Sequence, residues 1–138
     1  MSTRGVAAFL AVAGLLFWSA NAFAQYGGLD ADELTVFYEV NAYRAQHGLP
    51  AVVLSPALTQ AADFHSNWMT NNNCFSHQCG YEPGFGERLI LAGYAWRRGA
   101  GENIAAGYSD GYNTFMQWVN SPPHRANFLD PRWSAMGI

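Results

Sequence analysis

The chain has 138 residues, which is room for one small domain. Half of the residues are hydrophobic and 15% are aromatic, a composition that excludes an intrinsically disordered chain. The 7 basic residues, all arginines, are outnumbered by 10 acidic residues and form no basic patch, so nucleic acid is excluded as an expected partner.

Residues 1–24 are typical of a cleavable signal peptide. Arg4 supplies a positive charge, and the apolar run over 6–18 is short for a membrane span. Small residues at 22 and 24 fit a cleavage site, so we expect cleavage between Ala24 and Gln25. The mature protein is then secreted or periplasmic and has no transmembrane segment. The alternative interpretation is an uncleaved membrane anchor.

Residues 25–33 form a lead-in that includes the predicted start of the first helix. Asp30 and Glu33 have the spacing of a capping box. In this motif the side chain of each residue accepts a hydrogen bond from the backbone N–H of the other. Val36 and Val40 lie on one apolar face, and Gly48 ends the helix.

A second helix is predicted to begin at Ser55 and Pro56, which are favoured at the N-cap and the first helical position. Apolar residues recur at helical spacing over 58–69. His65 lies on this stripe, and we interpret it as a hydrogen-bonded core histidine. Three asparagines at 71–73 end the helix.

The second half of the chain predicts shorter elements. These are a helix over 85–92, strands over 94–96 and 102–105, a helix capped by Ser109, a helical turn over 124–129, and a strand beginning over 134–138. A strand needs sheet partners, and none follows the last one. We therefore expect the chain to be truncated at its C-terminal end.

The two cysteines, Cys74 and Cys79, are expected to form a disulfide, because an exported protein meets oxidising conditions. The loop that they close contains His77. The competing interpretation makes Cys74, His77 and Cys79 zinc ligands.

Three side chains are candidates for a functional site. His77 lies in the constrained loop, and His124 follows two prolines that stiffen its approach. Glu102 opens an otherwise apolar strand after a Gly-Ala-Gly turn, although an exposed carboxylate at a strand end is an equally good interpretation.

Four motifs then occur in order. They are VNAYR at 40–44, FSH at 75–77, GENI at 101–104 and WVNSPPHRAN at 118–127. Together they resemble the CAP superfamily of cysteine-rich secretory, antigen 5 and pathogenesis-related proteins (SCP-like domains), and most closely its bacterial branch. The resemblance covers residues 34–138.

The resemblance implies an α+β fold, an α-β-α sandwich with a small central antiparallel sheet, whose final strand or strands are missing from this chain. It also implies a cleft in which histidines and glutamates meet. His77, Glu102 and His124 match the motif positions, whereas Ser121 stands where many eukaryotic members have a second glutamate.

Two imidazoles and a carboxylate are a reasonable ligand set for Zn²⁺, with a water in the fourth position. The predicted metal ligands are therefore His77, His124 and Glu102, and some relatives bind divalent metal in this cleft. Our leading hypothesis is an exported binding module with Zn²⁺ or another divalent cation as an optional cofactor. Its partner would be a small ligand, a lipid or an extracellular protein.

Two other functions stay open. A hydrolase could use a metal-activated water, or Ser76 or Ser121 as a nucleophile beside a histidine. Lipid or sterol binding would need an apolar groove, for which the candidate side chains are Trp68, Trp96, Trp118 and Phe128.

Overall fold

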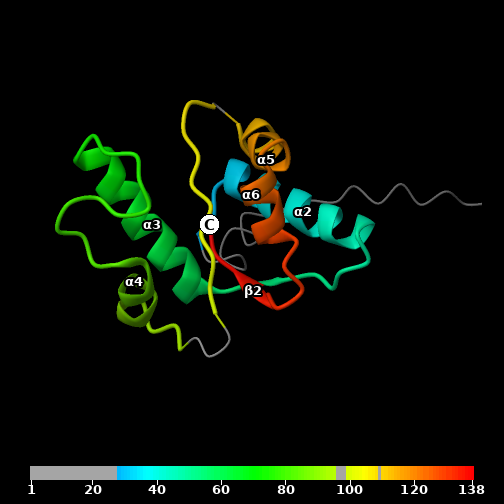
Figure 1. Ribbon diagram of the computed structural model, residues 1–138, viewed down its shortest axis with the longest axis horizontal. Helices are drawn as coiled ribbons and strands as arrows, with labels where there is room; N and C mark the ends of the chain where they lie inside the picture. Colours follow the sequence, from blue (N-terminus) through cyan, green and yellow to red (C-terminus); the bar gives the residue numbers. More distant parts are fainter. Residues whose placement is uncertain (1–27, 96–98, 109) are drawn as a thin grey trace, which may run out of the picture.

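The fold was analysed in a computed structural model that describes residues 28–95, 99–108 and 110–138 (Figure 1). The predicted signal peptide, its cleavage site, Trp96 and Ser109 lie outside the described residues. In chain order the elements are α2 (Ala31–Gln46), β1 (Val53–Leu54), α3 (Pro56–Asn71), α4 (Phe85–Leu91), α5 (Gly111–Val119), α6 (Pro122–Phe128) and β2 (Ala135–Met136).

The helix ends follow the capping signals of the sequence. The Asp30 carboxylate accepts hydrogen bonds from the N–H groups of Asp32 and Glu33, and Glu33 accepts one from the N–H of Asp30. The capping box of α2 is therefore confirmed. Ser55 caps α3 with Pro56 in its first turn, as predicted. The N-cap of α5 is Asp110 and not the predicted Ser109, and the Asp110 carboxylate accepts from the Asn113 N–H.

The apolar core lies where α2 meets α5 and α6. Val36 and Val40 of α2 are buried against Phe115 of α5 and Phe128 of α6. Tyr43 joins them, with its ring edge-on to both phenylalanines at centroid distances of 5.9 and 5.6 Å. The apolar face predicted for the first helix is thus the face that the fold buries.

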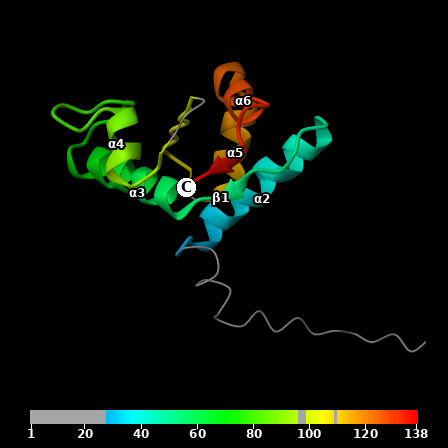
Figure 2. The ribbon, with the colours of Figure 1, turned by 90° about the horizontal axis from the view of Figure 1, so that it is seen from below.

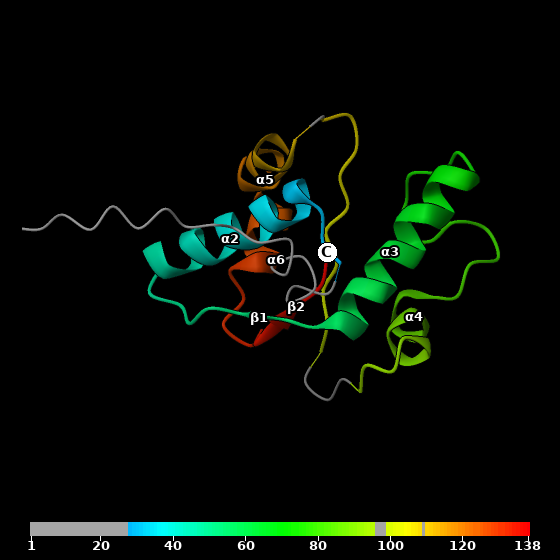
Figure 3. The same ribbon diagram turned by 180° about the vertical axis from the view of Figure 1, so that it is seen from behind.

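Three layers can be followed in the views from the front, from below and from behind (Figures 1, 2 and 3). Helices α2, α5 and α6 form one outer layer, and α3 and α4 form the other. The strand pair β1–β2 and the extended segment 99–108 pass between them. The α+β class and the α-β-α arrangement predicted from the sequence are confirmed.

The strands differ from the prediction in direction and number. β1 and β2 pair in parallel, with Val53 opposite Ala135 and Leu54 opposite Met136, whereas an antiparallel sheet was expected. Parallel strands need a long crossover connection, and the chain between β1 and β2, which includes α3, α4, α5 and α6, supplies it.

The two strands predicted between α4 and α5 do not form among the described residues. Tyr94 donates its N–H to the Leu89 carbonyl, and Gly93 has a φ of +82°, so this stretch closes the end of α4 in a Schellman turn. Residues 102–105 run extended without a backbone–backbone hydrogen bond to any described residue. The Ile104 carbonyl instead accepts from the Trp118 indole N–H at 3.1 Å.

Within the described ranges, no helix combines the length and the apolar character needed to cross a membrane.

Candidate functional site

His77 is carried by a short loop that a disulfide closes. Cys74 and Cys79 are bonded to each other, so the predicted disulfide is confirmed and the alternative with both cysteines as zinc ligands is excluded. Cys79 is buried, and its carbonyl accepts from the Trp68 indole N–H at 2.9 Å. The His77 side chain remains 57% exposed at the outside of the loop.

Glu102 meets His77 although the two residues are far apart in the sequence. The Nδ1 atom of His77 lies 2.8 Å from Oε1 of Glu102. The other carboxylate oxygen, Oε2, accepts from Nη2 of Arg88 at 2.7 Å. Two predicted site residues are therefore brought together, and both oxygens of the carboxylate are already engaged.

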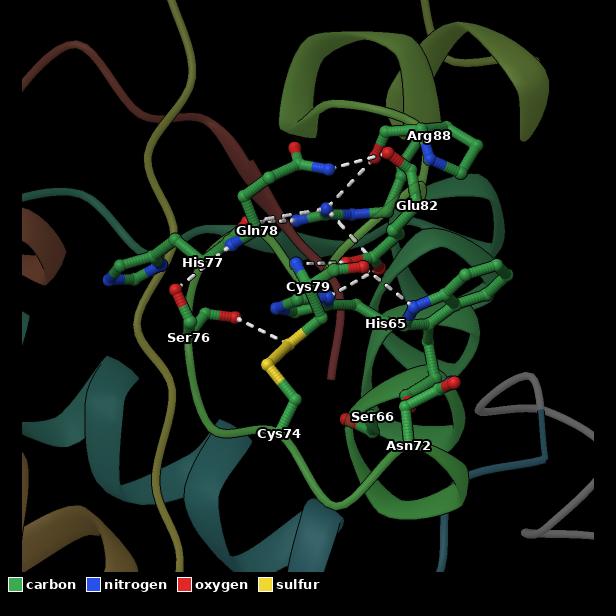
Figure 4. Close-up of polar contacts among 12 residues, drawn as sticks. His65, Ser66, Asn72, Cys74, Ser76, His77, Gln78, Cys79, Glu82 and Arg88 are labelled. Carbon is green, nitrogen blue, oxygen red and sulfur yellow. Dashed lines mark hydrogen bonds and ion pairs between the residues drawn. A yellow bond between two sulfur atoms is a disulfide. The ribbon is translucent and has the colours of Figure 1, made fainter.

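Three further polar side chains, which the sequence analysis did not assign to the site, lie close to one another (Figure 4). His65, Glu82 and Arg88 are all buried. The Nδ1 atom of His65 lies 2.6 Å from Oε1 of Glu82, and Nη1 of Arg88 lies 3.3 Å from the same oxygen. His65 is the hydrogen-bonded core histidine that was predicted, but its partner Glu82 places it in an ionic cluster.

One feature of the sequence hinted at this cluster. His65 and Arg88 each lie among apolar helix positions, where a charged or titratable side chain needs a buried partner. The partner, Glu82, comes from the loop after the disulfide, and nothing in the periodicity of a loop indicates which way a side chain points.

The second predicted histidine contacts Ser121. Ser121 is the N-cap of α6, and its Oγ lies 2.8 Å from Nδ1 of His124 in the first turn. The Asn103 side chain donates to the His124 carbonyl at 3.0 Å, and Asn127 donates to Asn103 at 2.9 Å. His124 is therefore tied to the residue that directly follows Glu102.

The predicted metal ligands do not form a three-ligand site in the part of the chain that the structure describes. That part holds no group of three or more His, Cys, Asp or Glu side chains that could bind a metal ion. Glu102 is a poor ligand here, because the Arg88 cation occupies one oxygen and His77 the other. Of the predicted ligands, the imidazoles of His77 and His124 are the ones that no cation of the described residues occupies.

A cavity of about 560 Å³ lies beside this site. It runs between α3, the extended segment 99–105 and β2, and its lining includes Leu58, Met69, Phe85, Trp118 and Phe128. Glu102 is the one predicted cleft residue that lines it; His77, Ser121 and His124 do not. Of the described apolar candidates, Trp118 and Phe128 line it, whereas Trp68 does not.

Comparison with known families supports the sequence motifs. The profile of the cysteine-rich secretory protein family, CAP, matches residues 37–138. Two Bacillus subtilis proteins are similar: YkwD is 31% identical over 113 residues, and the membrane protein YlbC is 34% identical over 98 residues. The matches cover 80% and 71% of this chain but 42% and 28% of the two relatives. The chain thus spans less than half the length of either.

Two solved structures resemble the fold. An extracellular protein containing an SCP domain from Bacillus anthracis has a TM-score of 0.74 and 34% identity, covering 77% of this chain and 35% of that protein. An outer surface protein of Borrelia burgdorferi has a TM-score of 0.67 and 17% identity, covering 79% and 81%. The second likeness concerns the fold alone.

Proposed function

Because the chain belongs to the cysteine-rich secretory protein (CAP) family, we propose that it is an exported binding module whose ligand contacts the His77 imidazole. The observation that carries this proposal is the His77–Glu102 pair: an exposed ring fixed in orientation by a carboxylate at 2.8 Å. An exposed histidine without a function gains little from such a partner, since its ring can hydrogen-bond to water.

The pair also determines which ring nitrogen meets the ligand. An ionised carboxylate only accepts hydrogen bonds, so Nδ1 of His77 carries the proton that it shares with Glu102. In a neutral ring the lone pair is then on Nε2, which can accept a hydrogen bond or bind a metal ion. Glu102 acts as the orienting partner in this arrangement, as carboxylates commonly do behind metal-binding histidines.

For a divalent cation such as Zn²⁺ we propose the imidazoles of His77 and His124 as protein ligands. Ser121 orients His124 at Nδ1 as Glu102 orients His77. When bound, the metal would supply a Lewis acid that attracts oxygen or nitrogen donors of a ligand. A proton on the coordinating ring nitrogen removes the lone pair that a metal ion needs, so the affinity should fall as the pH is lowered.

Calorimetric titration of the exported protein with Zn²⁺ tests the metal part of this proposal. We expect saturable binding that His77→Ala abolishes and His47→Ala preserves, with circular dichroism confirming that all three proteins are folded. His47 is a matched control because its ring contacts the Tyr43 carbonyl at the end of α2. Binding that survives in His77→Ala would reject this site, and no binding by folded wild-type protein would reject the metal.

A second candidate function is hydrolysis, favoured by the 2.8 Å contact between Ser121 Oγ and His124 Nδ1. In this interpretation His124 takes the proton of the Ser121 hydroxyl as the oxygen attacks a carbonyl, and returns it to the alcohol or amine that leaves when the ester or peptide bond breaks. Water then hydrolyses the acyl group from Ser121 and restores the hydroxyl. Ser76, the other serine considered, has its Oγ 3.4 Å from the Gln78 N–H. Turnover of an ester or peptide panel that is lost in Ser121→Ala, and retained in Ser76→Ala, would support the hydrolase; no turnover by the wild type would count against it.

Lipid binding is favoured by a different observation, the largely apolar cavity of about 560 Å³. Trp118 lines this cavity, so a fatty acid that enters it should change the tryptophan fluorescence. A saturable change that is lost in Trp118→Phe would support this function. A flat titration with both fatty acid and sterol would contradict it.

We propose a secreted or periplasmic location. The support is the N-terminal sequence together with the similarity to the SCP-domain structure from Bacillus anthracis, which is that of an extracellular protein. N-terminal sequencing of the exported protein should give Gln25 as the first residue. A start at Met1 in the membrane fraction would indicate an uncleaved anchor instead.

A further inference from the structure

We infer that the buried cluster of His65, Glu82 and Arg88 is a positioning device that holds Glu102 against His77. This inference rests on the proposed function, since it explains how the ligand-facing imidazole is fixed. The side chains of Glu82, Arg88 and His65 are 0%, 1% and 2% exposed, and that of Glu102 is 17% exposed. The buried cluster is thus connected through Glu102 to the exposed His77 ring.

Arg88 contacts both members of the His77–Glu102 pair. Its Nη2 donates to Glu102 Oε2 at 2.7 Å, and its Nη1 donates to the His77 carbonyl at 3.4 Å. The same guanidinium also donates to the Pro83 carbonyl at 3.2 Å. A rigid, forked cation therefore fixes the carboxylate relative to the backbone of the histidine that it binds.

Glu82 holds the loop from the other side. Its Oε2 accepts from the Cys79 N–H at 3.2 Å, next to the disulfide, while its Oε1 lies 3.3 Å from Nη1 of Arg88. The Gln78 side chain donates to the Glu82 carbonyl. The residues directly after His77 are thus tied to the same cluster that anchors Glu102.

His65 lies between the two carboxylates. Its Nδ1 is hydrogen-bonded to Glu82, and its Nε2 lies 3.8 Å from Oε1 of Glu102 with no hydrogen-bond partner in the described part of the chain. Oε1 is the oxygen that His77 binds, so His65 faces the shared atom from the buried side. Burying so many charged groups is usually no more stabilising than apolar packing, which favours a role in orientation over one in stability.

The test compares Arg88→Lys with Arg132→Lys. Lysine keeps the charge at position 88 but loses the fork, whereas Arg132 is exposed and pairs with Asp130 on the surface. Long-range ¹H–¹⁵N spectra report which ring nitrogen of His77 carries the proton, and a His77→Gln spectrum identifies the signal. Zn²⁺ alone serves as the binding probe.

We expect His77 to be in the Nδ1–H form in the wild type and in Arg132→Lys. Arg88→Lys should give a mixture of the two tautomers and a Zn²⁺ affinity lower by about tenfold or more, the usual effect of losing an orienting partner. An unchanged His77 tautomer in folded Arg88→Lys would overturn the inference. The tautomer is read without any ligand, so a protein that shows it but binds no Zn²⁺ supports the positioning device and rejects only the metal.

If Arg88→Lys does not fold, the double variant Glu82→Gln/Arg88→Met decides. It removes one positive and one negative charge together, so the net charge of the cluster is unchanged. We expect the same mixture of tautomers, because Glu102 has lost its anchor. A pure Nδ1–H form in the folded double variant would show that the cluster serves packing alone.

Discussion

Arg44 illustrates how one buried polar side chain holds distant segments together. Its guanidinium is fully buried and donates to the carbonyls of Pro50, Phe128, Asp130 and Trp133 at 2.8–3.2 Å. These carbonyls belong to the segment after α2, to the last residue of α6 and to the connection from α6 to β2. Arg44 thus satisfies backbone groups that no regular element could pair.

We predict that Arg44→Met lowers the free energy of unfolding by more than about 3 kcal/mol. Each buried carbonyl left without a donor costs about 1–3 kcal/mol, and the methionine fills the space without donating. Urea unfolding followed by circular dichroism measures the change. Arg132→Met is the control, and it should lower the free energy of unfolding only slightly because that side chain is exposed. An equally small decrease in Arg44→Met would contradict the role given to Arg44.

Asp130 makes the stability depend on pH. The Arg132 guanidinium and backbone N–H lower the pKa of Asp130 from 3.8 to about 2. The folded protein therefore binds this proton less readily than the unfolded chain does. The ionised Asp130 carboxylate therefore adds to the free energy of unfolding above about pH 4, and this contribution is lost as the pH falls towards about 2.

The measurement is the urea midpoint between pH 5 and pH 2. The curve of Asp130→Asn should be flatter than that of the wild type over this range. Asp63 supplies a control of opposite sign, because burial raises its pKa, so protonating it in acid relieves a cost in the folded state. Parallel curves for the wild type and Asp130→Asn would rule out this contribution.

The sequence identifies the exposed half of the site better than its buried half. His77 and Glu102 are recognisable because a constrained loop and a Gly-Glu-Asn motif surround them. Glu82 has no such signal, since a glutamate in a loop usually faces solvent, and Arg88 is marked only by its place among apolar helix positions. Their burial depends on how α4 packs on α3, which is a tertiary property.

At the scale of elements, the long helices could be predicted because residues favoured at the N-cap mark where they begin. Asp30 and Ser55 mark the two long helices, and both act as N-caps in the structure. The strands were not predictable in the same way, because each has only two residues and periodicity needs more. In the extended residues 102–105 only Ile104 and Ala105 are apolar, and the Ile104 carbonyl accepts its hydrogen bond from the Trp118 side chain and not from a neighbouring strand.

The loop that carries His77 allows a prediction at this scale. Replacing both cysteines, as Cys74→Ser/Cys79→Ser, should lower the free energy of unfolding by about 2 kcal/mol, because the unfolded chain loses a six-residue cross-link. Ser76→Ala, inside the same loop, should leave it nearly unchanged. Equal urea midpoints for the double variant and the wild type would mean that the disulfide adds nothing to stability.

At the scale of the whole molecule, the two helical layers are held together by what lies between them. Helix α2 packs on α5, and α3 packs on α4, while β1 and β2 join the middle of the fold. After β2 the Ile138 N–H contacts the Thr59 hydroxyl of α3 at 3.4 Å. The end of β2 is therefore where the strand layer meets the α3 layer.

Gly137 gives the last prediction, since it lies at this meeting point. A Cβ atom there would come within 2.1 Å of the Leu58 carbonyl carbon and the Thr59 nitrogen, both backbone atoms of α3. Backbone atoms cannot turn aside as a flexible side chain does, so the layers would have to separate. Gly137→Ala should therefore lower the free energy of unfolding by about 1–3 kcal/mol, as overpacking usually does. Gly84→Ala is the matched control, because a Cβ there meets only the Gln78 side chain at 3.7 Å. If Gly137→Ala has the same urea midpoint as the wild type, the contact between the end of β2 and α3 does not contribute to the free energy of unfolding.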